Sequence, residues 1–220
     1  MSYSLLVMSK SPELGRVKTR MQPHLTQSQS LQLHIMLAHH VLPIWSNVKS
    51  LSMELWIGGD IEIFKQKVIL PLNDATLLNN DFSNVAIYSQ PQGDLGSRMA
   101  HAVRSAFSRG ILGVFLVGTD CPFIDENYLL QAIQQLEEND VVLGPANDGG
   151  YVLMGLKKYH PALFDNIPWG TSTVLEDTER AINEVALSSH LLSSLSDIDV
   201  PEDLHLLAKK NIFPQSLLSQ

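Results

Sequence analysis

The residue most clearly placed for chemistry is Asp120, which directly follows the apolar stretch VFLVGT at residues 114–119. An apolar, β-branched run that stops at glycine and proline predicts a buried strand. In an open parallel sheet, ligands bind at the carboxyl ends of the strands. A carboxylate at that edge is available to bind a metal ion or to accept a hydrogen bond from a substrate hydroxyl.

A basic loop follows the first apolar stretch of the chain. Its sequence, KSPELGRVKTR at residues 10–20, carries four cations against one glutamate, a local charge of +3 in a chain of net charge −8. Glycine lets a backbone approach a phosphate, and lysine and arginine neutralise phosphate oxygens. Because Walker A and GxGxxG patterns are absent, two interpretations stay open, a phosphate-binding loop and a solvated charged loop. The candidate phosphate ligands are Lys10, Gly15, Arg16, Lys18 and Arg20.

A second glycine-containing turn, at residues 90–99, also follows a predicted strand. Gln92, Gly93, Asp94 and Arg98 are its candidate ligand-binding residues. On the residues alone, the favoured interpretation is that Asp94 caps the following helix and pairs with Arg98 on the surface.

Two further aspartates lie where predicted strands end. Asp148 precedes two glycines, so it is either a site residue or part of a tight turn in which it bonds to its own backbone. Asp199 is either the cap of the last predicted helix or a ligand. Cys121 is not expected to act as a nucleophile, because the charge of the neighbouring Asp120 would raise the pKa of its thiol.

The composition limits the class of protein. Hydrophobic residues make up 45% of the chain and charged residues only 17%, which predicts a compact globular fold, and a single domain at residues 1–220 accommodates the length. A net charge of −8 argues against general binding to nucleic acid or anionic membranes. One cysteine, no signal-peptide pattern and no apolar stretch of ~18 residues predict a cytoplasmic protein without a membrane span.

Alternating strands and helices must position these side chains. Because only about six residues separate the predicted strands at 141–144 and 151–156, no crossover helix can join them, and the sheet must be mixed. The expected fold is an α/β, three-layer α/β/α sandwich around a mainly parallel, mixed sheet, with the candidate sites on one edge. The predicted strands are 3–8, 51–57, 85–88, 114–119, 141–144, 151–156 and 191–195; the predicted helices are 26–45, 61–70, one ending near 109, 125–138, 161–165, 171–184 and 201–209, while 71–83 has no assignment.

Six motifs occur in order along nearly the whole chain: KSPELGRVKTR at 10–20, QGDLGSR at 92–98, GTDCP at 118–122, GPANDGGY at 144–151, WGTSTV at 169–174 and DIDVPEDL at 197–204. Together they resemble a bacterial family of candidate glycosyltransferases, DUF2064. That family belongs to the nucleotide-diphospho-sugar transferase superfamily, which has the GT-A fold.

The resemblance implies roles for the candidate residues. It implies that Asp120 binds Mg²⁺ or Mn²⁺ and that a nucleotide cradle is formed by Lys10, Gly15, Lys18 and Arg20. By analogy with related nucleotidyltransferases, Asp199 is the second metal carboxylate and Asp148 faces the acceptor, which makes Asp120 and Asp148 the catalytic pair. Two departures weaken any direct transfer of mechanism. The first loop lacks the GGxSxRxGxxK pattern of molybdenum-cofactor nucleotidyltransferases, and Gly118 stands where a DxD motif would have its first aspartate.

Two enzymatic functions therefore stay open. The first is metal-dependent transfer of a sugar from a nucleotide-diphospho-sugar to an unidentified small-molecule acceptor. The alternative is nucleotidyl transfer from a nucleoside triphosphate with release of pyrophosphate, as in the related guanylyltransferase that activates phospholactate. A third, non-enzymatic interpretation is a nucleotide-binding module. The base, the sugar, the acceptor, the stereochemical outcome and the oligomeric state do not follow from the sequence.

Overall fold

A mixed sheet forms the centre of the protein, in a computed structural model that describes residues 3–74 and 82–209. Its strands are β1 (Tyr3–Lys10), β2 (Leu51–Gly58), β3 (Ala86–Ser89), β4 (Gly113–Gly118), β5 (Val141–Pro145), β6 (Tyr151–Leu156) and β7 (Ser189–Leu191). They lie in the order β3-β2-β1-β4-β6-β5-β7. β6 is antiparallel to both of its neighbours, whereas the other neighbouring strands are parallel. The predicted mixed sheet is confirmed.

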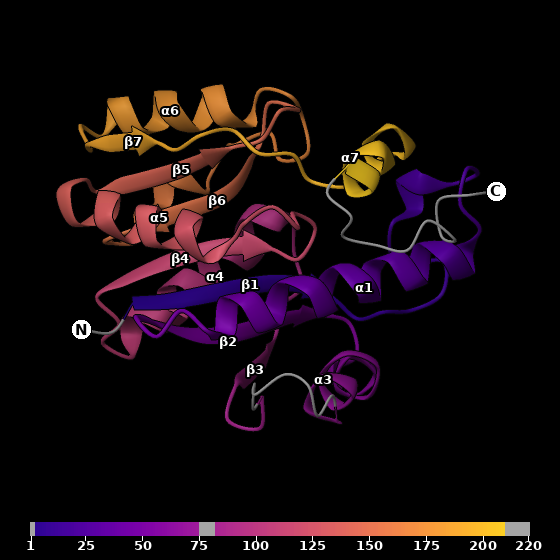
Figure 1. Cartoon of the computed structure of the whole chain (residues 1–220). Coiled ribbons are helices and arrows are strands. Elements are labelled where there is room, and N and C mark those ends of the chain that lie inside the picture. Colours follow the sequence, from indigo (N-terminus) through magenta and orange to yellow (C-terminus); the bar gives the residue numbers. More distant parts are fainter. Residues whose placement is uncertain (1–2, 75–81, 210–220) are drawn as a thin grey trace.

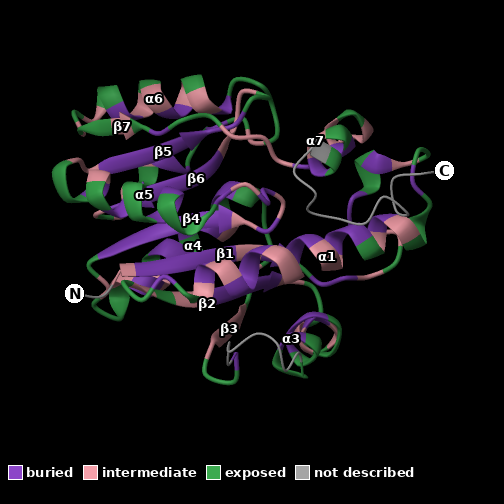
Figure 2. Cartoon of the chain, in the orientation of Figure 1, coloured by how far each residue is buried: buried purple, intermediate pink, exposed green. Residues whose placement is uncertain are grey.

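Helices cover both faces of the sheet and complete the predicted three-layer sandwich (Figure 1). One face packs on α1 (Gln27–Ser46) and α5 (Glu126–Glu138), and the other on α4 (Leu95–Ser108) and α6 (Val174–Glu184). Side chains alternate along β1, so Leu5 and Val7 join the first hydrophobic core and Leu6 joins the second. Figure 2 shows the central strands as the most continuously buried part of the chain.

Three helices begin at the predicted caps. Thr26 and Gln29 form a capping box at the start of α1. The side chain of Asp94 accepts from the backbone N–H of Ser97, and that of Asp125 from the N–H of Tyr128, each at 2.8 Å. Within the described residues, no helix is long and apolar enough to cross a lipid bilayer.

One predicted helix start and one predicted cap are wrong. α6 begins at Val174 rather than at residue 171, because the hydroxyl of Thr171 donates to the carbonyl oxygen of Pro168 and belongs to the preceding turn. The last helix, α7 (Leu204–Lys209), follows a 3₁₀ turn at Pro201–Asp203. There the carboxylate of Asp203 accepts from the N–H groups of Asp199 and Val200, so Asp199 is not the cap.

Other boundaries differ by a few residues. After α2 (Ile61–Phe64) the chain forms a π-helix at Lys65–Ile69 and then α3 (Leu70–Asp74), so helical structure extends into the stretch without a predicted assignment. Residues 75–81 of that stretch lie outside the described residues. The predicted helix at 161–165 is a 3₁₀ turn. β7 lies earlier than predicted, although residues 192–195 still hydrogen-bond to β5 and its end.

A smaller hydrophobic cluster lies beyond the carboxyl ends of the strands, where Figure 1 labels α7. It joins the first half of α1, the 3₁₀ turn at Thr19–Met21 and α7. This cluster holds the chain after β7 against the basic loop, a contact that no local pattern predicts. Its buried members are Met21, Leu25, Leu33, Leu37, Ile198, Leu204 and Leu207.

Candidate active site

The basic loop and the end of β4 meet in an ion pair. The ammonium nitrogen Nζ of Lys18 lies 2.7 Å from Oδ1 of Asp120 and donates to the carbonyl oxygen of Ile198 at 2.5 Å. The Lys18 side chain is 2% exposed, whereas the Asp120 side chain is 47% exposed. Lys18 is therefore enclosed between two predicted motifs, and part of the Asp120 carboxylate faces solvent.

The backbone of the basic loop turns through two left-handed residues, Gly15 with φ 73° and Lys18 with φ 49°. That region is unfavourable for a side chain such as lysine, so the two contacts of the Lys18 ammonium must offset the cost. Val17 and Met21 are buried on either side and anchor the loop. At its start, Nε2 of His34 bonds to the carbonyl oxygen of Lys10 at 2.9 Å, and burial lowers the pKa of His34. A neutral imidazole thus positions the backbone of Lys10.

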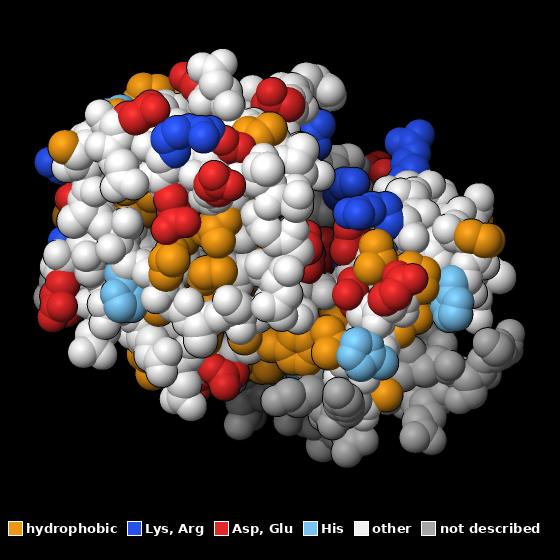
Figure 3. All heavy atoms as spheres, turned by 90° about the horizontal axis from the view of Figure 1, so that it is seen from above, with side chains coloured by type: hydrophobic (Ala, Val, Ile, Leu, Met, Phe, Trp, Pro, Cys, Tyr) orange, Lys and Arg blue, Asp and Glu red, His pale blue; other side chains and the backbone are white. Residues whose placement is uncertain are grey.

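A second ion pair joins the basic loop to the motif near the end of the chain. Nη1 of Arg20 lies 2.6 Å from Oδ2 of Asp199. Between the two ion pairs, the N–H of Ile198 donates to the carbonyl oxygen of Asp120 at 2.9 Å. Seen from above, acidic side chains gather in a hollow of the surface with lysine and arginine side chains beside them (Figure 3). Residues from three distant motifs therefore form one site.

Four carboxylates of this edge interact electrostatically. Burial, followed by the charges of Asp148, Asp199 and Asp120, raises the pKa of Asp197 to about 6. Asp120 shifts in the opposite direction. Burial acts to raise its pKa, but the positive charge of Lys18 and the hydrogen bond from its ammonium, with smaller contributions from nearby groups, outweigh burial and hold the pKa below its usual value. The basic loop therefore keeps Asp120 ionised, while the rest of the edge carries excess negative charge.

Asp148 is part of a tight turn and also lies among the carboxylates of the candidate site, so both interpretations that the sequence left open describe it. Its Oδ1 accepts from the N–H of Gly150 at 3.0 Å, which is the tight-turn geometry. The residue is also exposed, and its charge acts on Asp197. Gly149 has φ 93°, and a Cβ atom there would lie 2.0 Å from the carbonyl oxygen of Ser172. The predicted motif at 169–174 thus packs directly on this turn.

Replacing Gly149 with Ala should lower the free energy of unfolding by about 2–4 kcal/mol, because the methyl group meets the backbone of Ser172 and the residue keeps a left-handed φ. Gly118→Ala is the matched control, since an added Cβ at Gly118 meets no atom within 4 Å. Urea denaturation of both variants measures the difference. Equal stability of the two variants would show that the turn can move away from Ser172.

The second glycine-containing turn serves its own helix. Asp94 caps α4, and Nε of Arg98 donates to the carbonyl oxygen of Gly93 at 2.8 Å. Gln92, Gly93 and Asp94 are exposed. This is the capping role that the residues alone favoured, with Arg98 bonding to the turn's backbone. Contact of this turn with a nucleotide stays a prediction.

Comparison with known proteins identifies the family of the chain. Residues 49–171 match the family described as "Uncharacterized protein conserved in bacteria (DUF2064)". The chain belongs to the DUF2064 family. A search of curated proteins found no significant match for this DUF2064 chain.

Solved structures agree with the superfamily of this DUF2064 protein. A candidate nucleotide-diphospho-sugar transferase from Desulfovibrio desulfuricans G20 is 28% identical with a TM-score of 0.78, over 96% of this chain and 88% of that one. The fold is also that of a 4-diphosphocytidyl-2C-methyl-D-erythritol synthase from Anaerococcus prevotii DSM 20548 (13% identity, TM-score 0.58, 94% and 96% covered). It is shared by CMP:2-keto-3-deoxy-manno-octonic acid synthetase complexed with CTP (9% identity, TM-score 0.57, 96% and 100% covered).

Sequence patterns missed several groups at the edge of this DUF2064 protein. The sequence placed Asp197 with Asp199 at a strand-to-loop edge, but it did not predict that Asp197 is partly buried and has a raised pKa. Nε2 of Gln90 donates to the carbonyl oxygens of Ser9 at 3.1 Å and Trp56 at 2.8 Å, so it ties together the carboxyl ends of β1 and β2. The hydroxyls of Ser9 and Thr119 lie 3.1 Å apart between β1 and β4. The position of Gln90, directly after a predicted strand, was the available signal.

The donor atoms of the edge fit a magnesium or manganese ion that also binds phosphate. Lys18 engages one oxygen of Asp120 and Arg20 engages one oxygen of Asp199, so each carboxylate has a second oxygen for a cation. Magnesium typically takes one or two carboxylates and completes its shell with phosphate and water. In the described part of the chain no three His, Cys, Asp or Glu side chains are grouped as metal ligands, so the protein supplies only part of such a shell.

Replacing Asp197 with Asn should stabilise the protein at neutral pH more than in acid. Because the folded pKa of about 6 lies above the unfolded value of about 3.9, the folded state binds the proton more tightly, and this contribution to stability falls as the pH rises between the two values. Asn does not ionise, so the variant loses no stability in this way as the pH rises. The free energy of unfolding of the variant, relative to the parent protein, should therefore grow by about 2–3 kcal/mol between about pH 4 and pH 7.

Denaturant unfolding over that pH range measures the growing advantage of Asp197→Asn over the parent protein. Asp165→Asn, which removes an exposed carboxylate outside the site, should show no comparable trend. A constant difference between Asp197→Asn and the parent at all pH values would contradict the raised pKa.

Proposed function

We propose that this protein transfers a sugar from a nucleotide-diphospho-sugar to a small-molecule acceptor at the edge formed by Lys18, Asp120 and Asp199. Its transferase superfamily supports this proposal. The observation that carries it is the enclosed Lys18 ammonium, 2.7 Å from Asp120, in a loop of net positive charge that faces a group of carboxylates. Such an edge can hold a diphosphate through cations on one side and a divalent metal ion on the other.

The basic loop would bind the diphosphate. Arg16 and Arg20 are exposed and Lys10 lies at the end of β1, so their charges can reach phosphate oxygens. Gly15 would let the backbone approach. Lys18 would contribute its charge while it holds Asp120 and Ile198 in place. Gln92, Gly93, Asp94 and Arg98, in the second turn, would contact the remainder of the nucleotide.

Asp120 and Asp199 would hold Mg²⁺ or Mn²⁺ through their second oxygens. When bound, the metal ion would neutralise negative charge on the leaving diphosphate. The metal ion would also compensate the negative charge of the neighbouring carboxylates, which acts together with burial to raise the pKa of Asp197.

In the transfer step, the bond between the anomeric carbon and the diphosphate oxygen breaks, and a bond from the anomeric carbon to the acceptor oxygen forms. The acceptor hydroxyl loses its proton. The exposed carboxylate of Asp148, held in its turn by Gly150, would orient the hydroxyl and accept that proton.

Nucleotidyl transfer is the alternative function, and two structural neighbours that share the fold motivate it. They are a 4-diphosphocytidyl-2C-methyl-D-erythritol synthase and a CMP:2-keto-3-deoxy-manno-octonic acid synthetase, the latter complexed with CTP. In that reaction an acceptor oxygen would attack the α-phosphate of a nucleoside triphosphate, and pyrophosphate would leave. The same basic loop and carboxylates would serve.

Incubation with Mn²⁺ and either each nucleoside triphosphate or a set of labelled nucleotide sugars separates the two functions. Sugar transfer predicts release of the nucleoside diphosphate and a labelled product, and chelation of the metal with EDTA should remove the activity. Release of pyrophosphate without turnover of nucleotide sugars would overturn sugar transfer. Thermal-shift binding of nucleotides without turnover of either class would favour a nucleotide-binding module.

A further inference from the structure

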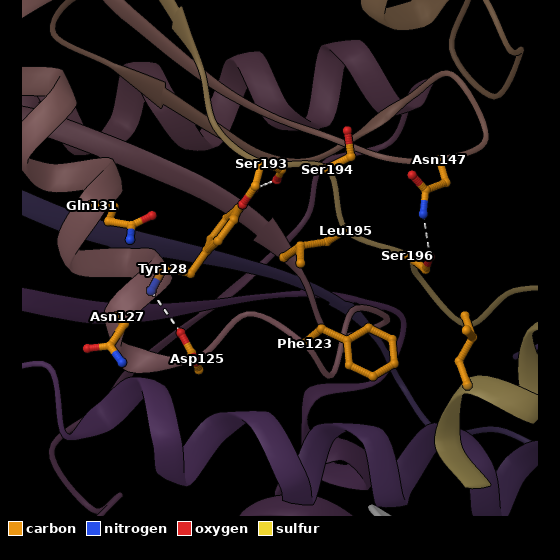
Figure 4. Close-up of a pocket in the computed structure, with 11 residues that line it drawn as sticks. Phe123, Asp125, Asn127, Tyr128, Gln131, Asn147, Ser193, Ser194, Leu195 and Ser196 are labelled. Carbon is orange, nitrogen blue, oxygen red and sulfur yellow. Dashed lines mark hydrogen bonds between the residues drawn. The ribbon is translucent and has the colours of Figure 1, made fainter. Parts of the chain in front are cut away.

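A second recess lies beside the acidic edge, between the start of α5 and the chain that follows β7 (Figure 4). Its volume is about 490 Å³, within the range of roughly 300–1,000 Å³ that small-molecule sites occupy. Residues of α5 form one wall, and residues 193–196 form the other. The lining consists of Phe123, Asp125, Asn127, Tyr128, Gln131, Asn147, Ser193, Ser194, Leu195, Ser196 and Leu206.

The recess adjoins the candidate active site but has its own walls. Asn147 and Ser196 line it, and each directly precedes an aspartate of the acidic edge, Asp148 and Asp197. Nδ2 of Asn147 donates to the hydroxyl of Ser196 at 2.7 Å, which ties the turn after β5 to the wall formed by residues 193–196 (Figure 4). A ligand in the recess would therefore lie beside the two segments that carry Asp148 and Asp197.

The lining is polar and almost uncharged. It offers three side-chain amides, three serine hydroxyls and one carboxylate, and it includes no lysine, arginine or histidine among the described residues. The carboxylate, Asp125, already accepts the N–H of Tyr128 as the cap of α5. A phosphorylated ligand would meet no cation here, whereas a neutral polyhydroxyl ligand would meet both donors and acceptors.

Apolar surface accompanies these polar groups. Phe123, Leu195 and Leu206 are half-buried and line the recess together with the ring of Tyr128. The C–H face of a sugar ring can pack on such surface while its hydroxyls reach amides and serines. Two hydrogen bonds hold the walls in place. The hydroxyl of Tyr128 donates to the carbonyl oxygen of Ser193 at 2.9 Å, and the N–H of Leu195 donates to the carbonyl oxygen of Pro145. A preformed site loses less free energy to ordering when a ligand binds.

We propose that this recess binds a neutral, unphosphorylated saccharide unit, and that this unit belongs to the acceptor of the transfer reaction. Saccharide binding follows from the lining of the recess alone. The role as acceptor rests on the proposed function, because it requires that the hydroxyl of the bound saccharide that receives the transferred sugar reach the carboxylate of Asp148.

Nuclear magnetic resonance of the full chain tests the binding. The probes are D-glucose, D-galactose, D-mannose, N-acetyl-D-glucosamine and cellobiose, each compared with glucose 6-phosphate. At least one neutral sugar should shift the side-chain amide resonances of Asn127, Gln131 and Asn147, and glucose 6-phosphate should bind more weakly. If no neutral sugar shifts these resonances, or if the phosphorylated sugar binds more tightly, the proposal is wrong.

A pair of variants on α5 localises the effect. Gln131→Ala removes an exposed amide of the lining and should weaken saccharide binding about fivefold, the effect of one lost hydrogen bond. Gln134→Ala removes an exposed amide of the same helix outside the recess and should leave binding unchanged. Equal affinities in the two variants would overturn the assignment of the site.

The same variants separate this proposal from the proposed function. If nucleotide sugars are turned over but Gln131→Ala changes neither sugar binding nor the KM for the acceptor, the recess is not the acceptor site although sugar transfer stands. If neutral sugars bind in the recess while no nucleotide sugar is turned over, the saccharide site stands and the glycosyltransferase function fails.

Discussion

An Asp120→Asn variant should lose at least about 100-fold in kcat/KM in whichever transfer reaction the protein catalyses, while it keeps its fold. Asn keeps the shape of the side chain and can still accept from Lys18, but it removes the anionic ligand for the metal ion. Because the Lys18 side chain is only 2% exposed, loss of its counter-charge should also lower the free energy of unfolding. That loss should be limited to about 1–2 kcal/mol, since Asp120 itself is half-exposed.

Steady-state kinetics with Mn²⁺ and a melting curve on the same sample measure both effects. Asp165→Asn is the matched control for removal of a carboxylate, and it should keep full activity and stability. If Asp120→Asn turned over substrate at the rate of the parent protein, Asp120 would be a structural partner of Lys18 and not a catalytic residue.

A Lys18→Met variant should bind nucleotides with Mn²⁺ roughly 30-fold more weakly, a loss of about 2 kcal/mol, because the enclosed positive charge that holds Asp120 in place beside the phosphate site is removed. Methionine keeps the length of the side chain and its apolar contacts. It also removes the charge that holds the pKa of Asp120 below its usual value, so that pKa should rise. Ile198 loses the partner of its carbonyl oxygen, which should cost about 1–2 kcal/mol of stability.

Calorimetric titration with a nucleotide and Mn²⁺ measures the affinity of Lys18→Met, and Lys49→Met, which removes an exposed lysine before β2, is its control. Lys49→Met should match the parent protein in both affinity and stability. A Lys18→Met protein that is less stable but binds nucleotide with unchanged affinity would identify Lys18 as a purely structural residue.

Local patterns predicted the architecture because strands, short connections and helix caps depend on interactions between residues that are close in sequence. An apolar, β-branched run bounded by glycine and proline, such as the one before Asp120, favours a buried strand. The short connection between β5 and β6 permits only an antiparallel pair. Helix caps at Thr26, Asp94 and Asp125 were predictable for the same reason, since a cap bonds only two or three residues away. The predicted start of α6 failed because Thr171 bonds backward to Pro168 rather than forward.

Strand and helix patterns predicted that carboxylates and a basic loop share one edge of a mixed α/β sheet, and the order of the motifs indicated the DUF2064 family. Which charges meet at that edge depends on the tertiary structure. Lys18 faces Asp120, and Arg20 reaches Asp199 across 179 residues of sequence. The burial of Asp197 and the polar recess beside α5 likewise depend on how the chain after β7 packs on α1 and α5. Such contacts join segments that are distant in sequence, and their free energy comes from the packing of the whole fold, which periodicity and spacing along the chain do not report.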